Sequence, residues 1–137
     1  MERLEQIIAS HAGREGPLLP ILHDVQAEWG HVSEAAIRAI ALALNLSRAD
    51  VHGVVSFYHD FHEVPEPHAV VKLCRAEACQ ARGVEALVAA LPSNPRVKVE
   101  PVYCLGLCSV GPNAMIGDKV HARLDAAKLG ALMEGLA

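Results

Sequence analysis

The four cysteines of this chain lie in two close pairs, and this spacing constrains the fold more than any other feature. Four residues separate Cys74 from Cys79, and three separate Cys104 from Cys108. A foldable segment lies between the pairs, so one domain can bring all four thiols to a single inorganic centre. We therefore expect Cys74, Cys79, Cys104 and Cys108 to be the ligands of one metal or cluster site.

The composition is that of a globular protein. The 137 residues are 52% hydrophobic and 20% charged, enough for one domain or two small ones. A net charge of −4 and few aromatic side chains argue against a nucleic-acid partner. No apolar run approaches the ~20 residues of a membrane span, and the N-terminus does not resemble a signal peptide. We expect a cytoplasmic protein with no membrane segment, in a reducing compartment where structural disulfides are rare.

Residues 1–65 have the periodicity of a helical bundle. Apolar residues spaced i, i+3, i+4 predict helices over 4–11 and 18–29, with Trp29 on the inner face of the second and Gly30 as its stop. Ser33 is the expected N-cap of a third helix. The stretch 47–50 has the pattern of a capping box before a fourth helix at about 51–56.

Residues 66–137 predict a small α/β domain after a proline-containing linker at 63–67. Strands are expected at 69–73 and 97–102, with Pro101 favouring an edge position or a bulge in the second. A helix at 84–91, closed by Pro92, should separate them. A hairpin over 114–121 turns at Gly117 and Asp118, and Asp125 is the expected cap of a last helix. The fold class is therefore α/β, with helices covering a mixed sheet.

Three chemistries remain open for the cysteines. Disulfides require an oxidising compartment, which nothing else in the sequence indicates. A structural zinc ion accepts four thiolates, although zinc knuckles favour a two-residue gap in both pairs. An iron–sulfur cluster has precedent for a four-residue gap in plant-type ferredoxins. Neither pair has the Cys-x-x-Cys spacing of a redox dithiol.

The residues around the cysteines suit a [2Fe–2S] cluster, whose core and four thiolates together carry a charge of about −2. Gly106 and Gly111 would let the backbone approach the sulfurs, and Arg75 would place a positive charge beside Cys74. Leu105 and its apolar neighbours would limit access of water.

The sequence resembles the thioredoxin-like [2Fe–2S] ferredoxins, the family of the 24-kDa subunit of respiratory complex I. The string 102–112, VYCLGLCSVGP, is similar to the second cluster loop of that family, and 74–80, CRAEACQ, is similar to the first. The first loop most resembles the gamma subunit of NAD-dependent formate dehydrogenase. A segment at 51–58, VHGVVSFY, is also similar to a family segment.

This resemblance implies a helical N-terminal region, 1–65, followed by a thioredoxin-like domain, 66–137, holding one [2Fe–2S] cluster on the four cysteines. It also implies a flavoprotein partner subunit that binds FMN and NAD(H), within a dehydrogenase complex. The 24 residues between Cys79 and Cys104 are fewer than the family usually has, with Ser93-Asn94-Pro95 as a tight connection.

Other motifs for chemistry are weak or absent. His52, His59, His62 and His68 lie near one another in the sequence, which raises a second metal site as an alternative to ordinary surface histidines. No nucleotide-binding or hydrolase motif is present, so the isolated chain is expected to have no catalytic activity. Two other functions stay open: a zinc-stabilised interaction module and a free-standing ferredoxin that works as a homodimer.

Overall fold

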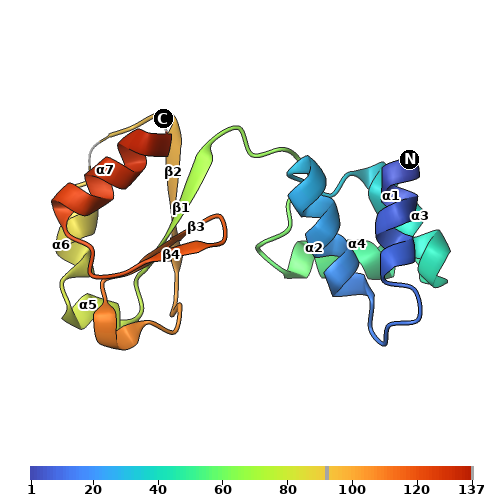
Figure 1. Cartoon of the computed structure of the whole chain (residues 1–137), viewed down its shortest axis with the longest axis horizontal. Coiled ribbons are helices and arrows are strands. Elements are labelled where there is room, and N and C mark those ends of the chain that lie inside the picture. The colour runs from blue at the N-terminus through green and yellow to red at the C-terminus, as the bar shows by residue number, and fades with distance from the viewer. Residues whose placement is uncertain (92, 137) are drawn as a thin grey trace. The chain divides into compact units, whose positions relative to one another are not determined.

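The computed structural model describes residues 1–91 and 93–136 of the chain. The chain folds as two compact units, Met1–Pro67 and His68–Ala137 (Figure 1). The boundary expected from the sequence, after residue 65, lies two residues before this division. Pro92, the expected end of a helix, lies outside the described residues. No helix among those described is long and apolar enough to cross a membrane.

The first unit consists of the helices that the apolar periodicity predicts. They are α1 (Glu2–Ser10), α2 (Leu18–Trp29), α3 (Glu34–Leu44) and α4 (Arg48–Phe57). Their inner faces form one core, whose fully buried members include Ile21, Leu22, Val25, Ile37 and Ile40. Trp29 is an exception to the prediction, because as the last residue of α2 it is 41% exposed.

Side chains and backbone conformation set the helix ends where the sequence places them. The hydroxyl of Ser33 accepts a hydrogen bond from the N–H of Ala36 at 3.1 Å, which starts α3. Gly30 ends α2 with a φ of 75°, in the left-handed region that glycine enters without a steric penalty. The predicted capping box is present at α4, where Ser47 and Asp50 each accept a hydrogen bond from the other's backbone N–H.

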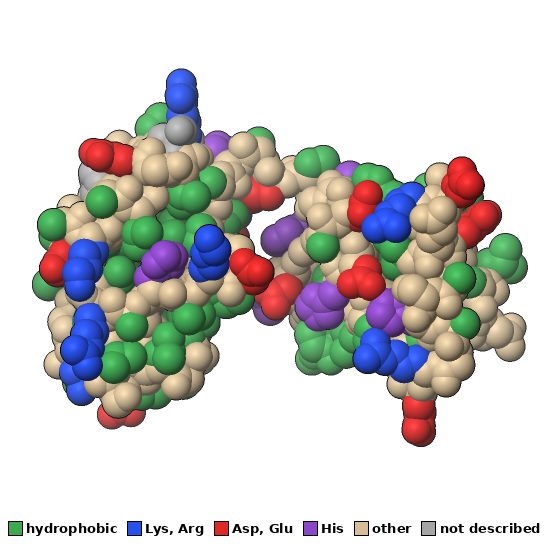
Figure 2. All heavy atoms as spheres, in the orientation of Figure 1, with side chains coloured by type: hydrophobic (Ala, Val, Ile, Leu, Met, Phe, Trp, Pro, Cys, Tyr) green, Lys and Arg blue, Asp and Glu red, His purple; other side chains and the backbone are tan. Residues whose placement is uncertain are grey.

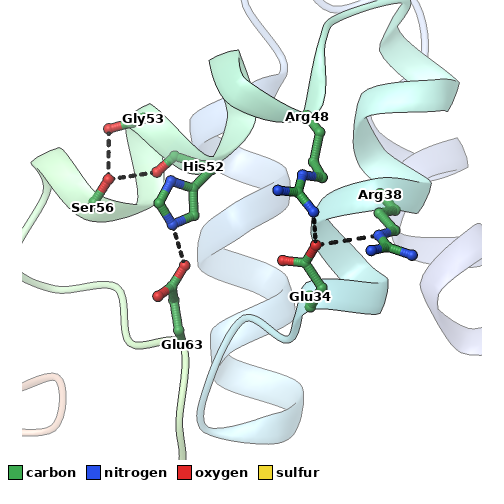
Figure 3. A network of polar contacts seen from close by, with 7 residues as sticks. All are labelled: Glu34, Arg38, Arg48, His52, Gly53, Ser56 and Glu63. Atoms are coloured by element: carbon green, nitrogen blue, oxygen red, sulfur yellow. Dashed lines mark hydrogen bonds and ion pairs between the residues drawn. The ribbon is translucent and has the colours of Figure 1, made fainter.

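Polar contacts join the helices of this unit to one another and to the chain that leaves them. Glu34 on α3 binds Arg38 at 3.2 Å and Arg48 on α4 at 2.5 Å (Figure 3). The Gln26 side chain donates to the carbonyl of Asp60 and accepts from the N–H of His62 at 2.8 Å. Gln26 therefore fixes the chain after α4 against α2.

The second unit is a four-stranded mixed sheet with helices. In chain order it contains β1 (Ala69–Cys74), α5 (Glu77–Ala81), α6 (Val84–Ala89), β2 (Val97–Val102), the 3-10 turn η1 (Cys108–Val110), β3 (Ala114–Ile116), β4 (Lys119–His121) and α7 (Ala126–Leu136). The strand order is β2-β1-β3-β4, with β1 and β2 parallel and the other pairs antiparallel. The edge position of β2, the hairpin and the Asp125 cap of α7 are as predicted.

The core of the second unit lies on one face of this sheet. Val71 and Leu73 alternate along β1 and are buried together with Val84 of α6 and Leu129 of α7. Figure 1 shows α6 and α7 on the same side of the strands. Cys74 and Cys79 belong to this same buried cluster, so the first cysteine pair is anchored in the core.

We predict that Ile37→Ala lowers the free energy of unfolding of the helical unit by roughly 2–5 kcal/mol. Ile37 is fully buried, so the change deletes core contacts and leaves a cavity. Leu42→Ala on the same helix is the matched control, because Leu42 is 86% exposed and should change stability by no more than about 0.5 kcal/mol. Denaturant unfolding followed by circular dichroism measures both. An equal loss of unfolding free energy in the two variants would contradict the burial of Ile37 in the core.

We also predict an acid dependence at the start of α4. Hydrogen bonds from the Ser47 hydroxyl and backbone hold the pKa of Asp50 below its ordinary 3.8. The ionised cap therefore stabilises the folded unit above pH 3.8, and this stabilisation is lost as the pH falls through the lowered value. A ¹³C NMR titration of the Asp50 carboxyl should show the lowered pKa, and Ser47→Ala should move it back toward 3.8. No change in this variant would disprove the capping contribution.

Candidate metal centre

The first cysteine pair is buried at the end of a strand. Cys74 is the last residue of β1, and Cys79 lies on the short helix α5 that follows; each is 1% exposed. A hydrogen bond joins the two side chains. The sequence did not predict α5, because five residues are too few to show a helical period.

The second pair is exposed and lies on the loop after β2. Cys104 has a φ of 84°, unusual for a residue with a side chain, and Cys108 opens the turn η1. Their sulfurs are 3.6 Å apart. This is far longer than a disulfide bond of about 2.0 Å, so both are free thiols.

The parallel pairing of β1 with β2 brings the two pairs together. Cys74 is the register partner of Val102, and the ladder continues with the N–H of Arg75 donating to the Val102 carbonyl at 2.8 Å. Two residues later, the N–H of Cys104 donates to the sulfur of Cys74 at 3.3 Å. The end of the sheet thus places the start of one cysteine loop directly against the other, and α5 packs against η1.

The arrangement of the sulfurs suits two metal ions that each take two thiolates. With a metal–sulfur distance of about 2.3 Å, two thiolates on one tetrahedral ion lie roughly 3.7 Å apart. The 3.6 Å between Cys104 and Cys108 is close to this value. Within 1–91 and 93–136, no three His, Cys, Asp or Glu side chains are grouped as ligands of one ion. The pairwise grouping matches a diiron core, which takes two thiolates at each iron.

Backbone N–H groups surround the buried sulfur of Cys74. Burial opposes ionisation of this thiol, but hydrogen bonds from the backbone of Ala76, Cys104 and Leu105 and from the Cys79 thiol outweigh it. The pKa of Cys74 is lowered as a result. A thiolate, the form that binds metal, is therefore stabilised at this position.

The other two perturbed thiols lie beside it. Burial and the hydrogen bond to Cys74 raise the pKa of Cys79, although the backbone N–H of Asn113 acts in the opposite direction. The contact with the Cys104 sulfur, and repulsion from Cys104 and Cys74, raise the pKa of Cys108. The charges of the two pairs therefore influence each other, as four thiolates around one small centre would.

Two glycines shape the second loop for different reasons. A Cβ on Gly111 would lie 3.1 Å from the sulfur of Cys79 and 3.4 Å from Cδ of Arg82, so the backbone passes the sulfur too closely for a side chain. Gly106 meets no such crowding, but its φ is 79°, and its N–H donates to the Cys104 sulfur at 3.4 Å. The backbone thus approaches a sulfur at both glycines, as predicted, and Gly106 in addition supplies a left-handed backbone conformation.

Comparison with known proteins places this chain in a family. The thioredoxin-like [2Fe-2S] ferredoxin family matches residues 4–137, nearly the entire chain. The chain belongs to this family of ferredoxins. Its cofactor is one [2Fe–2S] cluster, which supplies one-electron chemistry when bound, and the chain is an electron-transfer protein.

Relatives of this ferredoxin are subunits of larger oxidoreductases. A subunit of the NADH-quinone oxidoreductase of Rhizobium meliloti is 31% identical, over 97% of this chain and 86% of the relative. The corresponding subunit of the Escherichia coli K12 enzyme is 30% identical, over 97% and 87%. The HndA subunit of the NADP-reducing hydrogenase of Solidesulfovibrio fructosivorans is 28% identical, over 87% and 76%.

A solved structure of an NAD⁺-reducing [NiFe]-hydrogenase in the air-oxidised state has the same fold. The TM-score is 0.72 with 26% sequence identity, covering 88% of the ferredoxin and 22% of the hydrogenase chain. The ferredoxin therefore spans about a fifth of that longer chain.

Arg75 does not act as the free positive charge expected beside the first cysteine of the ferredoxin. Its guanidinium binds both carboxylate oxygens of Glu85 on α6, at 3.0 and 2.6 Å. This pair raises the pKa of Arg75 and lowers that of Glu85. Other Lys and Arg side chains lie along the left edge of this unit in Figure 2, on the side of α5, α6 and α7. Negative charge on the sulfurs is therefore stabilised by backbone N–H dipoles and not by the guanidinium of Arg75.

The histidine cluster does not form a second metal site among the described residues. His52 instead binds the carboxylate of Glu63 at 2.8 Å, within the helical unit (Figure 3). Sequence reasoning missed Asn113, a buried polar residue beside the cysteines. No pattern marks it, because an asparagine after a proline resembles an exposed turn residue.

We predict that Gly111→Ala weakens cluster retention and lowers the stability of the second unit by about 1–3 kcal/mol. The new methyl group would displace the Cys79 sulfur by a few tenths of an ångström. Gly130→Ala on α7 is the control, because a Cβ there has nothing within 4 Å and alanine favours helix. Iron content after gel filtration and thermal unfolding measure both effects. Equal iron content in the two variants would refute the crowding at Cys79.

Proposed function

We propose that this ferredoxin is a one-electron carrier subunit whose cluster is held by Cys74, Cys79, Cys104 and Cys108. The observation that carries the proposal is the convergence of two thiol pairs at one end of the sheet, with the Cys104 N–H donating to the Cys74 sulfur. Backbone donors around Cys74 favour thiolate and compensate the negative charge of the bound centre.

The two pairs have different surroundings, and this difference suits a carrier. Cys74 and Cys79 are buried in the core and hold one side of the site rigidly, away from water. Cys104 and Cys108 are exposed, so a partner protein can approach this side closely. Electrons would enter and leave through the exposed pair, and the degree of exposure would help set the reduction potential.

The partner is a flavoprotein subunit that binds FMN and NAD(H), in a cytoplasmic oxidoreductase complex. The chain's relatives are subunits of NADH-quinone oxidoreductases and of an NADP-reducing hydrogenase, which supports an NAD(P)-linked complex. For the parent enzyme we propose an NAD-dependent formate dehydrogenase, on the wording of the first cysteine loop, 74–80. Formate would be bound on another subunit.

Two alternative functions can be separated from this proposal by experiment. A zinc-stabilised module would require all four sulfurs around one ion, whereas no three of the described His, Cys, Asp and Glu side chains are grouped around one point. A free-standing homodimeric ferredoxin would have the same cluster but no flavoprotein. Affinity purification from the native host separates these: co-purification of a flavin-containing subunit with formate-dependent NAD⁺ reduction supports the proposal. A ferredoxin recovered only with itself supports the homodimer.

The cluster assignment has a direct test. Anaerobically purified protein should contain about two iron and two sulfide per chain and give an EPR signal only after reduction. Cys104→Ser should lose most of this iron while the helical unit keeps its circular dichroism. Ser109→Ala, an exposed neighbour without a thiol, is the control. A full iron complement with an unchanged spectrum in Cys104→Ser would remove Cys104 from the ligands. One zinc and a colourless wild-type protein would refute the cluster itself.

A further inference from the structure

Asn113 is a buried polar residue beside the cysteines that the proposed ligand set does not use. It follows Pro112 and precedes β3, and its side chain is 1% exposed. Of the described side chains, it is the one polar member of the buried set. Burying an amide is unfavourable unless its hydrogen bonds are made, so its contacts should explain its presence.

Its backbone binds the first member of the buried cysteine pair. The carbonyl of Asn113 accepts the N–H of Cys74 at 3.0 Å. The backbone of the preceding Gly111 passes so close to Cys79 that a Cβ there would lie 3.1 Å from its sulfur, so the strand entry at Asn113 also runs beside Cys79. These contacts fix Asn113 relative to the first cysteine pair, whatever its side chain does.

Its side chain reaches the other cysteine loop. Nδ2 donates to the carbonyl of Leu107 at 2.9 Å. The same carbonyl accepts the N–H of Val110 at 3.1 Å, a bond that closes the turn η1. Leu107 immediately precedes Cys108, so the amide holds the turn from which the Cys108 sulfur projects. One residue thus links the buried pair to the exposed pair.

The other half of the amide makes no bond. Oδ1 of Asn113 is buried and has no hydrogen-bond partner among the described residues. A buried acceptor without a hydrogen bond lowers the stability of the fold. A hydrophobic side chain of similar size would not have this unfavourable contribution. An asparagine is therefore disfavoured here unless its Nδ2 donor has a role. The bond to Leu107 is the role that the contacts indicate.

We propose that Asn113 is a positioning residue, which sets the exposed Cys104–Cys108 pair against the buried pair so that both can hold one cluster. This inference rests on the proposed function. The carbonyl of Asn113 anchors it to the backbone of Cys74, and its Nδ2 binds the turn that precedes Cys108. Loss of the donor should loosen the second pair without displacing the first.

The test uses two replacements of similar size in the full chain, Asn113→Asp and Asn113→Leu. Both remove the Nδ2 donor, and only the first adds a charge, so effects common to both report the lost hydrogen bond. Each variant should release iron to a chelator about 10-fold faster than wild type, as is usual for residues that orient metal ligands. Asn94→Asp is the control. Its Oδ1 acceptor, which binds the N–H of Arg96 at 3.0 Å, is kept, and it lies at the opposite end of β2 from the cysteines.

A second readout distinguishes positioning from general destabilisation. Paramagnetically shifted NMR signals of the cysteine β-protons report on each ligand separately. In both variants the signals of Cys104 and Cys108 should move further than those of Cys74 and Cys79. The bond from Cys74 to the Asn113 carbonyl involves only backbone, so hydrogen exchange at Cys74 should stay slow.

Each outcome is decisive. Wild-type rates of iron release in both variants would overturn the proposal, as would equal shifts of all four cysteine signals. Fast hydrogen exchange across the whole sheet would assign Asn113 to folding rather than positioning, and would also overturn it. A wild-type protein without a cluster would refute the proposed function. Normal iron release by the variants, with a cluster present in the wild type, would refute only the role of Asn113.

Discussion

The parallel pairing of β1 with β2 is the interaction on which the rest of the metal centre depends. Because Cys74 and Val102 are register partners, both strands end together and their loops leave the sheet at the same place. The N–H of Cys104 then reaches the sulfur of Cys74. A shift of one residue in this register would turn Val71 and Leu73 away from the core, and the two cysteine loops would no longer leave the sheet together. The hydrophobic side chains that fix the register, Val71 and Leu73, therefore also fix where the two cysteine loops meet.

Much of this arrangement is predictable from local sequence signals. The caps at Ser33 and Ser47, the stop at Gly30 and the hairpin at Gly117 each depend on a few adjacent residues, and each lies where the sequence places it. The cysteine spacing likewise predicts two pairs, because the members of each pair are close together in the sequence. Local chemistry thus determines the helix ends, turns and grouping of ligands.

Features that depend on distant residues were not predictable. Arg75 and Glu85 are ten residues apart, and nothing local reveals that their pairing neutralises the charge expected at the cysteines. Asn113 resembles a turn residue until its contacts with Cys74 and Leu107 are known. Trp29 has the helical spacing of a core residue but lies at the last position of α2, where the bundle no longer covers it. In each case tertiary packing decides what the local pattern leaves open.

The two cysteine pairs differ in how they would respond to air before metal is loaded. The exposed sulfurs of Cys104 and Cys108 are 3.6 Å apart, so a small motion brings them to bonding distance, whereas Cys74 and Cys79 are shielded from solution oxidants. Oxidation of the metal-free polypeptide would thus begin at Cys104 and Cys108, and a disulfide there would block half of the proposed ligands. With these four residues as the proposed ligands, the exposed pair must stay reduced until iron is bound.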